Sequence, residues 1–255
     1  MKKTGCIVID IGNTSTGLGF YKAGKVSCVH HVRGGLQTNP QHIHEALSSL
    51  RMKEAERVVI ASVVPSINAR WVRLFKKEFA LPSLVVSNTT PMPIGIRYPK
   101  PETIGADRLV NACGAFVRYG APAIVADFGT ALTFDVLGKD GNYIGGVIAP
   151  GLPLMTDYLY EKTALLPRVD LSGKCPPVGT STENAMRIGA RIGHRGMVRE
   201  TIHYLLDTTG KDVTLCATGG YARWALEGIN MPFHIDPDLT LFGLGVIHDY
   251  QGNQI

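Results

Sequence analysis

The stretch Val8-Ile9-Asp10-Ile11-Gly12-Asn13-Thr14 returns later in the chain as Val125-Ala126-Asp127-Phe128-Gly129-Thr130. In each copy an apolar, strand-like run ends at an aspartate, and a glycine stands two positions further on. At the same constant offset, and without a gap, three further identities occur: Thr16 with Thr133, Lys22 with Lys139 and Gly24 with Gly141. The matches indicate that one β-hairpin has been duplicated within the chain.

The Asp-x-Gly corner of each copy suits phosphate binding. A glycine there allows a sharp backbone turn, so that successive N–H groups can face phosphate oxygens without a Cβ in the way. Asn13 and Thr14 add side-chain donors, and Asp10 is placed to face a cation. A single corner of this kind is usually an ordinary turn. Two corners in register resemble the paired phosphate hairpins of actin, sugar kinases and acetate kinase, which hold a polyphosphate between two lobes.

The composition of the chain fits a folded enzyme. Its 255 residues are 45% hydrophobic and 18% charged, enough core material for one large domain or two medium ones. The net charge is +5, but the basic residues are scattered, so we expect no nucleic-acid partner. Five separated cysteines without a C-x-x-C pair indicate a reduced, cytoplasmic protein. No apolar stretch approaches the length of a membrane span, so we expect no membrane partner.

Strand and helix patterns alternate along both halves of the chain. Helices are predicted at 40–50 (opened by Asn39), 66–79, 106–119, 152–165, 183–206, 221–227 and 241–250. This order predicts an α/β fold. The resemblance of the duplicated hairpin to those of actin and sugar kinases implies two duplicated ribonuclease H-like lobes of the actin-like ATPase type, with mixed sheets flanked by helices. We place the N-terminal lobe at residues 1–120 and the C-terminal lobe at residues 121–255.

A third glycine-containing loop, Thr218-Gly219-Gly220, lies between a predicted strand and a predicted helix. Alone it would be a plain turn, but after two phosphate hairpins we interpret it as a surface for the adenosine of a nucleotide. The sequence has no Gly-x-x-x-x-Gly-Lys-Ser/Thr motif, which disfavours a P-loop kinase. It also lacks Gly-x-Gly-x-x-Gly, which disfavours a dinucleotide-binding fold.

Between the two hairpins, Asp107 and Arg108 stand in the first turn of a helix that is otherwise mostly apolar. An aspartate is favoured there by the helix dipole, and the pair could form only a surface salt bridge. The functional alternative is that Asp107 accepts a proton from a substrate hydroxyl while Arg108 holds a substrate anion.

Six blocks of the sequence, taken in order, resemble those of type III pantothenate kinases, and the likeness covers nearly the whole chain. The blocks are Asp10-x-Gly12-Asn13-Thr14, Gly105-x-Asp107-Arg108, Asp127-x-Gly129-Thr130-Ala131-x-Thr133, Gly145-Gly146-x-Ile148-x-Pro150-Gly151 with Ala164-x-Leu166-Pro167, Thr182-x-x-Ala185-Met186-x-x-Gly189, and Thr218-Gly219-Gly220. The resemblance implies transfer of the γ-phosphoryl group of ATP to the primary hydroxyl of pantothenate, the first step of coenzyme A biosynthesis.

The same resemblance implies a role for each matching residue. Asp107 would be the general base, and pantothenate would be bound by Tyr98, Gly105, Ala106, Asp107, Arg108 and Thr182. ATP would be bound by Asp10, Ile11, Gly12, Asn13, Thr14, Ser15, Thr16, Gly17, Thr130, Gly219 and Gly220. Asp10 would lie near Mg²⁺, and Asp127 would contact a monovalent cation, K⁺ or NH₄⁺. The family also implies a homodimer, with its dimer helices in the C-terminal lobe.

Two alternatives stay open from the sequence. One is a non-catalytic nucleotide-binding regulator that keeps the fold, although the presence of both Asp107 and Arg108 argues against it. The other is a kinase of the same superfamily that acts on a different small hydroxy acid, since residues distant in the chain shape the pocket.

Overall fold

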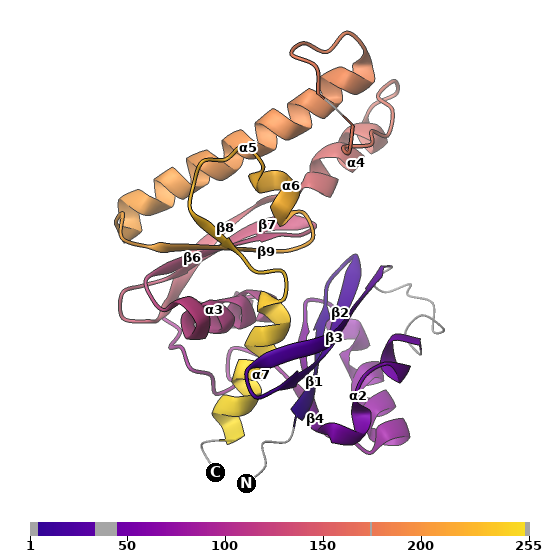
Figure 1. Cartoon of the computed structure of the whole chain (residues 1–255), viewed down its shortest axis with the longest axis vertical. Coiled ribbons are helices and arrows are strands. Elements are labelled where there is room, and N and C mark those ends of the chain that lie inside the picture. Colours follow the sequence, from indigo (N-terminus) through magenta and orange to yellow (C-terminus); the bar gives the residue numbers. More distant parts are fainter. Residues whose placement is uncertain (1–4, 34–44, 174, 253–255) are drawn as a thin grey trace. The chain divides into compact units, whose positions relative to one another are not determined.

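The computed structural model of the chain describes residues 5–33, 45–173 and 175–252. The first of its two sheets, in which Figure 1 labels β1 to β4, has the strand order β3-β2-β1-β4-β5. These strands are β1 (Gly5–Ile11), β2 (Ser15–Lys22), β3 (Lys25–Arg33), β4 (Ala55–Ser62) and β5 (Ser83–Val85). β1, β2 and β3 form an antiparallel meander, whereas β4 is parallel to β1 and to β5. The first sheet is therefore mixed.

The second sheet has the order β10-β9-β6-β7-β8. Its strands are β6 (Ala123–Phe128), β7 (Ala131–Leu137), β8 (Tyr143–Pro150), β9 (Thr214–Thr218) and β10 (Phe233–Ile235). Written from β8 to β10, this order repeats that of the first sheet, and β9 is likewise parallel to β6 and to β10. The duplication seen in the hairpins therefore extends over five strands. The prediction of two duplicated lobes with mixed sheets flanked by helices is confirmed.

The helices follow the predicted pattern, with shifts at their ends. They are η2 (Met52–Glu54), α2 (Pro65–Phe79), η3 (Pro101–Thr103), α3 (Ala106–Tyr119), α4 (Leu152–Lys162), α5 (Thr182–Thr209), α6 (Ala222–Leu226) and α7 (Leu239–Gly252). Part of the helix predicted at 40–50, including its cap Asn39, lies outside the described residues, and 45–48 are helical. No helix in the described ranges combines the length and the apolar character needed to cross a membrane.

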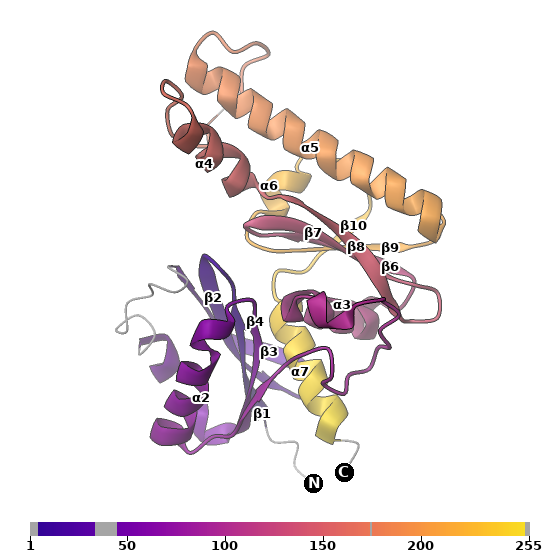
Figure 2. The ribbon, with the colours of Figure 1, turned by 180° about the vertical axis from the view of Figure 1, so that it is seen from behind.

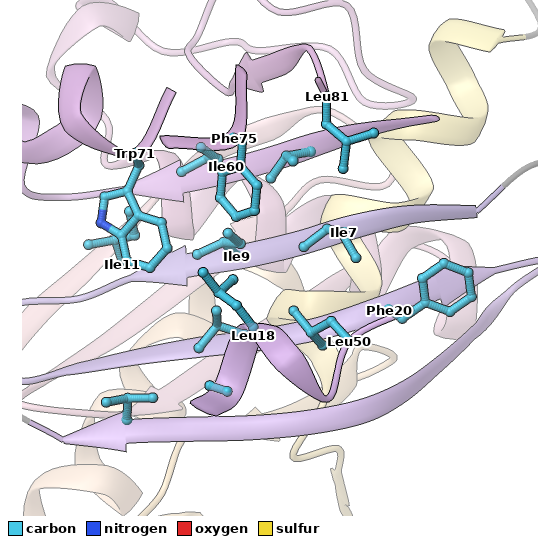
Figure 3. Close-up of a cluster of buried hydrophobic side chains, with 14 of the residues drawn as sticks. Ile7, Ile9, Ile11, Leu18, Phe20, Leu50, Ile60, Trp71, Phe75 and Leu81 are labelled. Atoms are coloured by element: carbon cyan, nitrogen blue, oxygen red, sulfur yellow. The ribbon is translucent and has the colours of Figure 1, made fainter. Parts of the chain in front are cut away.

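One face of the first sheet carries the hydrophobic core shown in Figure 3. Ile7, Ile9 and Ile11 alternate along β1 and are fully buried, which the two-residue period of a strand predicts. α2 covers this face with Trp71 and Phe75, which are one helical turn apart, and their ring centroids lie 6.0 Å apart. Burying each side chain of this size contributes about 1.5–3 kcal/mol, so this core fixes the position of β1.

The last helix, α7, packs on α3 (Figures 1 and 2). The two backbones approach closely at glycines: a Cβ on Gly114 would lie 2.9 Å from the carbonyl oxygen of Leu239, and one on Gly243 would overlap Val110. The Thr240 hydroxyl also donates a hydrogen bond of 2.7 Å to Oδ1 of the buried Asn111. α3 is thus held along its length by the C-terminal helix.

The chain divides into two compact units that interleave in sequence. The first holds the described residues through Ala121, Leu137–Gly145, and those from Asp238 onward; the second holds Pro122–Val136 and Gly146–Pro237. These units differ from the predicted lobes, 1–120 and 121–255, at 137–145 and after 237. The reason for the second difference is that α7 packs on α3 and on β1 and β2. The predicted lobe boundary stays a prediction.

Candidate active site

The first corner joins β1 to β2 in the first unit. The N–H of Gly12 donates to the carbonyl oxygen of Ser15 at 2.9 Å, which closes the turn. Gly12 is half-buried, whereas Asn13, Thr14 and Ser15 are exposed. This corner offers solvent the polar groups that a phosphate requires.

Other residues predicted to bind ATP in the same hairpin are placed differently. Ile11 and Thr16 form a cross-strand pair, and both side chains are buried on the core side. Gly17 pairs with the half-buried Asp10 on the opposite face. The side chains of Ile11 and Thr16 therefore do not face a nucleotide at the corner, and Gly17 has no side chain.

The second corner joins β6 to β7 in the second unit. Asp127 is half-buried, and the N–H of Gly129 donates to the carbonyl oxygen of Ala131 at 3.1 Å. Gly151, the N-cap of α4, donates its N–H to the carbonyl oxygen of Thr130 at 3.1 Å. A Cβ on Gly151 would overlap the carbonyl oxygens of Gly129 and Thr130, so only glycine fits where α4 begins.

The loop after β9 also lies against the second corner. Gly219 has φ +90°, and a Cβ there would lie 2.5 Å from Oδ1 of Asp127. The N–H of Tyr221 donates to the carbonyl oxygen of Phe128 at 3.2 Å. The first unit has an equivalent hydrogen bond, from the N–H of Val63 to the carbonyl oxygen of Ile11 at 3.1 Å. The structure therefore brings Gly219 to Asp127. In contrast, Gly220 is exposed, and a Cβ there would meet nothing within 4 Å.

Asp107 lies in the first turn of α3, shortly after the N-cap Gly105. Its Oδ1 accepts a hydrogen bond of 2.9 Å from the N–H of Arg108. A Cβ on Gly105 would lie 2.5 Å from the same oxygen, so the glycine makes room for the carboxylate. Burial raises the pKa of Asp107 above its ordinary value, although the hydrogen bond and charge of Arg108 oppose the shift. Asp107 is thus a half-buried carboxylate with increased basicity.

Tyr143, at the start of β8, links two parts of the predicted pantothenate site. The guanidinium of Arg108 lies 5.9 Å from the centroid of its ring. The ring of Tyr98 contacts the Tyr143 ring edge-on, at a centroid distance of 6.3 Å and an interplanar angle of 66°. Tyr98 is carried there by backbone pairing, since Arg97 donates to Tyr143 and Tyr143 to Gly95, each at 2.8 Å.

None of the sequence motifs includes Tyr143, although this residue is fully buried and its ring contacts both Arg108 and Tyr98. The only signal in the sequence is an aromatic residue at the start of a predicted strand. In the first unit, therefore, the structure brings Tyr98 and Arg108 together through a residue that the motifs leave out.

Thr182 lies in the second unit, at the start of α5. The Ser181 hydroxyl caps this helix by accepting a hydrogen bond of 3.2 Å from the N–H of Asn184. Thr182 lines a pocket of about 440 Å³ between α4 and α5 that is otherwise apolar. Its other lining residues are Met155, Leu159, Leu166, Ala185, Met186, Gly189 and Ala190. Thr182 thus supplies the hydroxyl group of an apolar pocket.

Arg187 holds the first turn of α5 against the preceding loop. Its Nε donates to the carbonyl oxygen of Asp170 at 2.8 Å, Nη1 to Oδ1 of Asn184 at 2.7 Å, and Nη2 to Oε1 of Glu183 at 2.6 Å. A Cβ on Gly173 would lie 2.9 Å from the Cζ atom of Arg187. The sequence gives no sign of this role, because a helical arginine is usually exposed.

The described residues contain no group of three or more His, Cys, Asp or Glu side chains that could hold a metal ion alone. Asp10 and Asp127 each contribute one carboxylate to its own corner. A single carboxylate such as that of Asp10 suits Mg²⁺, which is commonly bound by one or two protein carboxylates together with phosphates and water.

Two duplicated sheets, each with an Asp-x-Gly corner after its first strand, define the fold class of actin-like ATPases and sugar kinases. Three solved structures share the fold. A Baf family protein from Campylobacter jejuni has a TM-score of 0.59 at 16% identity, over 97% of this chain and 99% of that one. The ethanolamine utilization protein EutJ from Carboxydothermus hydrogenoformans has a TM-score of 0.55 at 12% identity, over 95% of this chain and 89% of that one. The Lmo2764 protein from Listeria monocytogenes, assigned as an N-acetylmannosamine kinase, has a TM-score of 0.52 at 10% identity, over 98% of this chain and 100% of that one.

The sequence comparisons identify the family. The sequence model of the type III pantothenate kinase family matches residues 6–204 of this chain. A type III pantothenate kinase of Akkermansia muciniphila is 43% identical over 210 residues, 82% of this chain and 84% of that protein. One of Dehalococcoides mccartyi is 35% identical over 254 residues, 97% and 98% of the two chains. The chain belongs to the type III pantothenate kinase family and is a phosphotransferase.

Proposed function

We propose that this chain transfers the γ-phosphoryl group of ATP to the primary hydroxyl of pantothenate and so forms 4′-phosphopantothenate, the first step of coenzyme A biosynthesis. The observation that carries the proposal is the half-buried Asp107 carboxylate beside Arg108, at the start of α3, in a chain of this family. Phosphoryl transfer requires mainly alignment of the reactants and neutralisation of phosphate charge. The site residues divide between these two tasks.

Asp107 is the general base in this proposal. It accepts the proton of the pantothenate hydroxyl as the oxygen attacks phosphorus, and its raised pKa favours that transfer. Its Oδ1 is held by the N–H of Arg108, which leaves Oδ2 for the substrate hydroxyl. Gly105 supports the role because a side chain there would displace this carboxylate.

Arg108 binds the carboxylate of pantothenate, for which a guanidinium offers two parallel donors. The ring contacts through Tyr143 support joint placement of Arg108 and Tyr98 in the first unit. Gly105 and Ala106 present backbone at the start of α3. Thr182 contributes a hydroxyl contact from the second unit, at the edge of the apolar pocket.

The phosphates of ATP bind to the two corners. At the first corner the phosphates are bound by the exposed Asn13, Thr14 and Ser15 and by the backbone from Asp10 to Gly17. At the second corner they are bound by Thr130. Asp10 would hold Mg²⁺, which would supply charge neutralisation when bound. Gly219 and Gly220 form the surface for adenosine.

Asp127 binds a monovalent cation, K⁺ or NH₄⁺, in this proposal. Carboxylate and backbone carbonyl oxygens are suitable donors for such a cation. Gly219 supports this assignment because a Cβ there would lie 2.5 Å from Oδ1 of Asp127, so a glycine allows the carboxylate to keep its position.

We also propose a cytoplasmic homodimer. Large apolar side chains gather on α4 and the segment after it, with Tyr158 61% and Leu165 90% exposed. Exposed apolar groups of this kind often mark interfaces, and a second copy is the commonest partner. All five cysteines are free, which fits a reducing compartment.

The experiment is ADP release from ATP and Mg²⁺, with and without pantothenate, in potassium and in sodium. Release that depends on both pantothenate and potassium supports the proposal. ATP binding without turnover on any small hydroxy acid identifies a regulator instead. Turnover on another small hydroxy acid, with none on pantothenate, identifies a different kinase of the superfamily.

A further inference from the structure

The last residue of β3, Arg33, lies beside the first phosphate corner. In the antiparallel pairing of β2 with β3, Ser15 is directly opposite Arg33 and Gly17 is opposite His31. Ser15 itself belongs to the corner, because its carbonyl oxygen accepts the N–H of Gly12. Although Arg33 and Ser15 are distant in sequence, the sheet makes them neighbours.

The register of this pairing is fixed by the core. Thr16 and Val32, which are opposite one another, are 3% and 8% exposed, whereas Ser15 and Arg33 are exposed. Opposed residues project to the same face of a sheet, and a slip of one position would move Arg33 to the buried face. Arg33 is therefore held on the face opposite to Thr16 and Val32, exposed beside Ser15 at the end of the strand.

The same face carries the other polar groups of the hairpin. Asp10 is opposite Gly17, and Gly17 is opposite His31, so these three form the next row across β1, β2 and β3. A Cβ on Gly17 would lie 3.5 Å from Nδ1 of His31, which places that ring over the glycine. Arg33 thus adds a permanent positive charge to the face that carries Asp10 and the corner.

We propose that Arg33 binds the polyphosphate of ATP together with the backbone N–H groups of the corner. The inference rests on the proposed function, in which this corner binds ATP. A guanidinium pairs with phosphate oxygens through two donors and keeps its charge at any physiological pH. It neutralises phosphate charge that Mg²⁺ leaves uncompensated, which phosphoryl transfer requires.

Lys25 offers a matched control. It is an exposed cation on the same strand, but it lies at the other end, opposite Lys22 in the turn between β2 and β3. Lys25→Ala removes the same charge from the same element without altering the corner. A general effect of net charge would therefore appear in both variants, whereas a phosphate contact would appear only at Arg33.

The test measures the affinity for ATP and Mg²⁺ by calorimetry without pantothenate, and then the KM values for ATP and pantothenate. Arg33→Ala weakens ATP binding about tenfold or more, as removal of a charge-assisted hydrogen bond should. Arg33→Lys recovers part of the loss, while Lys25→Ala and the KM for pantothenate change less than about twofold. Thermal unfolding of each variant verifies that it is folded.

Unchanged ATP affinity in folded Arg33→Ala would overturn the inference, as would an equal loss in Lys25→Ala. Absence of ATP binding by the unaltered chain would overturn it too. If the unaltered chain binds ATP but does not phosphorylate pantothenate, the proposed function fails. The binding comparison still decides the role of Arg33 in that case.

Discussion

Gly219 packs directly against the Asp127 carboxylate, so closely that a Cβ on Gly219 would lie 2.5 Å from Oδ1 of Asp127 and 2.6 Å from the carbonyl carbon of Phe128. Its φ of +90° also disfavours any side chain. The motif Thr218-Gly219-Gly220 therefore contains one glycine required by the second corner. The next glycine has no such constraint.

We expect Gly219→Ala to lower the free energy of unfolding by about 1–3 kcal/mol, because it combines backbone strain with a steric clash. If Asp127 binds the monovalent cation, the variant also needs more potassium for half-maximal activity. Gly220→Ala is the control for stability, since its Cβ meets nothing within 4 Å. Denaturant unfolding measures the stability of both variants, and a potassium titration measures the cation requirement of Gly219→Ala. An equal loss of stability in the two variants would contradict the close packing of Gly219.

Replacing Tyr143 tests whether its ring places Arg108 and Tyr98. We expect Tyr143→Leu to raise the KM for pantothenate about tenfold, because both ring contacts are lost, and to leave the KM for ATP nearly unchanged. Tyr143→Phe keeps the ring and should retain the affinity for pantothenate. The prediction is wrong if Tyr143→Phe raises this KM as much as Tyr143→Leu does.

Replacing Arg187 tests how much its hydrogen bonds stabilise the start of α5. Arg187→Met leaves the carbonyl of Asp170 and the side chains of Asn184 and Glu183 without their donor, so we expect a loss of about 2–4 kcal/mol in stability. Arg199→Met is the control, because Arg199 is exposed on the same helix. Chemical denaturation of both variants gives the comparison, and a loss below about 0.5 kcal/mol at Arg187 would show that the contacts contribute little.

The raised pKa of Asp107 makes a prediction about stability and pH. A carboxyl group whose pKa is higher in the folded state than in the unfolded state binds more protons when folded. Its contribution to stability therefore falls as pH rises from its ordinary pKa of 3.8 through the folded value. An asparagine side chain cannot ionise, so the variant Asp107→Asn should be more stable than the unaltered chain at neutral pH. This advantage should disappear towards pH 3.8, and an advantage independent of pH would contradict the assignment.

The sequence predicted both sheets through the repeated Asp-x-Gly hairpin, because such corners are local and depend on a few residue types. Other features depend on pairing between distant segments. Tyr143 joins Tyr98 to Arg108 only because 95–97 pair with the start of β8. The apolar pattern of 241–250 predicted a helix but not its place against α3, which Gly114 and Gly243 determine by close approach.

The turnover of Asp107→Asn tests directly whether Asp107 is the base of a pantothenate kinase. Asparagine keeps the Oδ1 that accepts the N–H of Arg108 but cannot accept the substrate proton. We expect unchanged ATP affinity and a fall in pantothenate-dependent ADP formation on the order of a hundredfold or more. Turnover equal to that of the unaltered chain would contradict it.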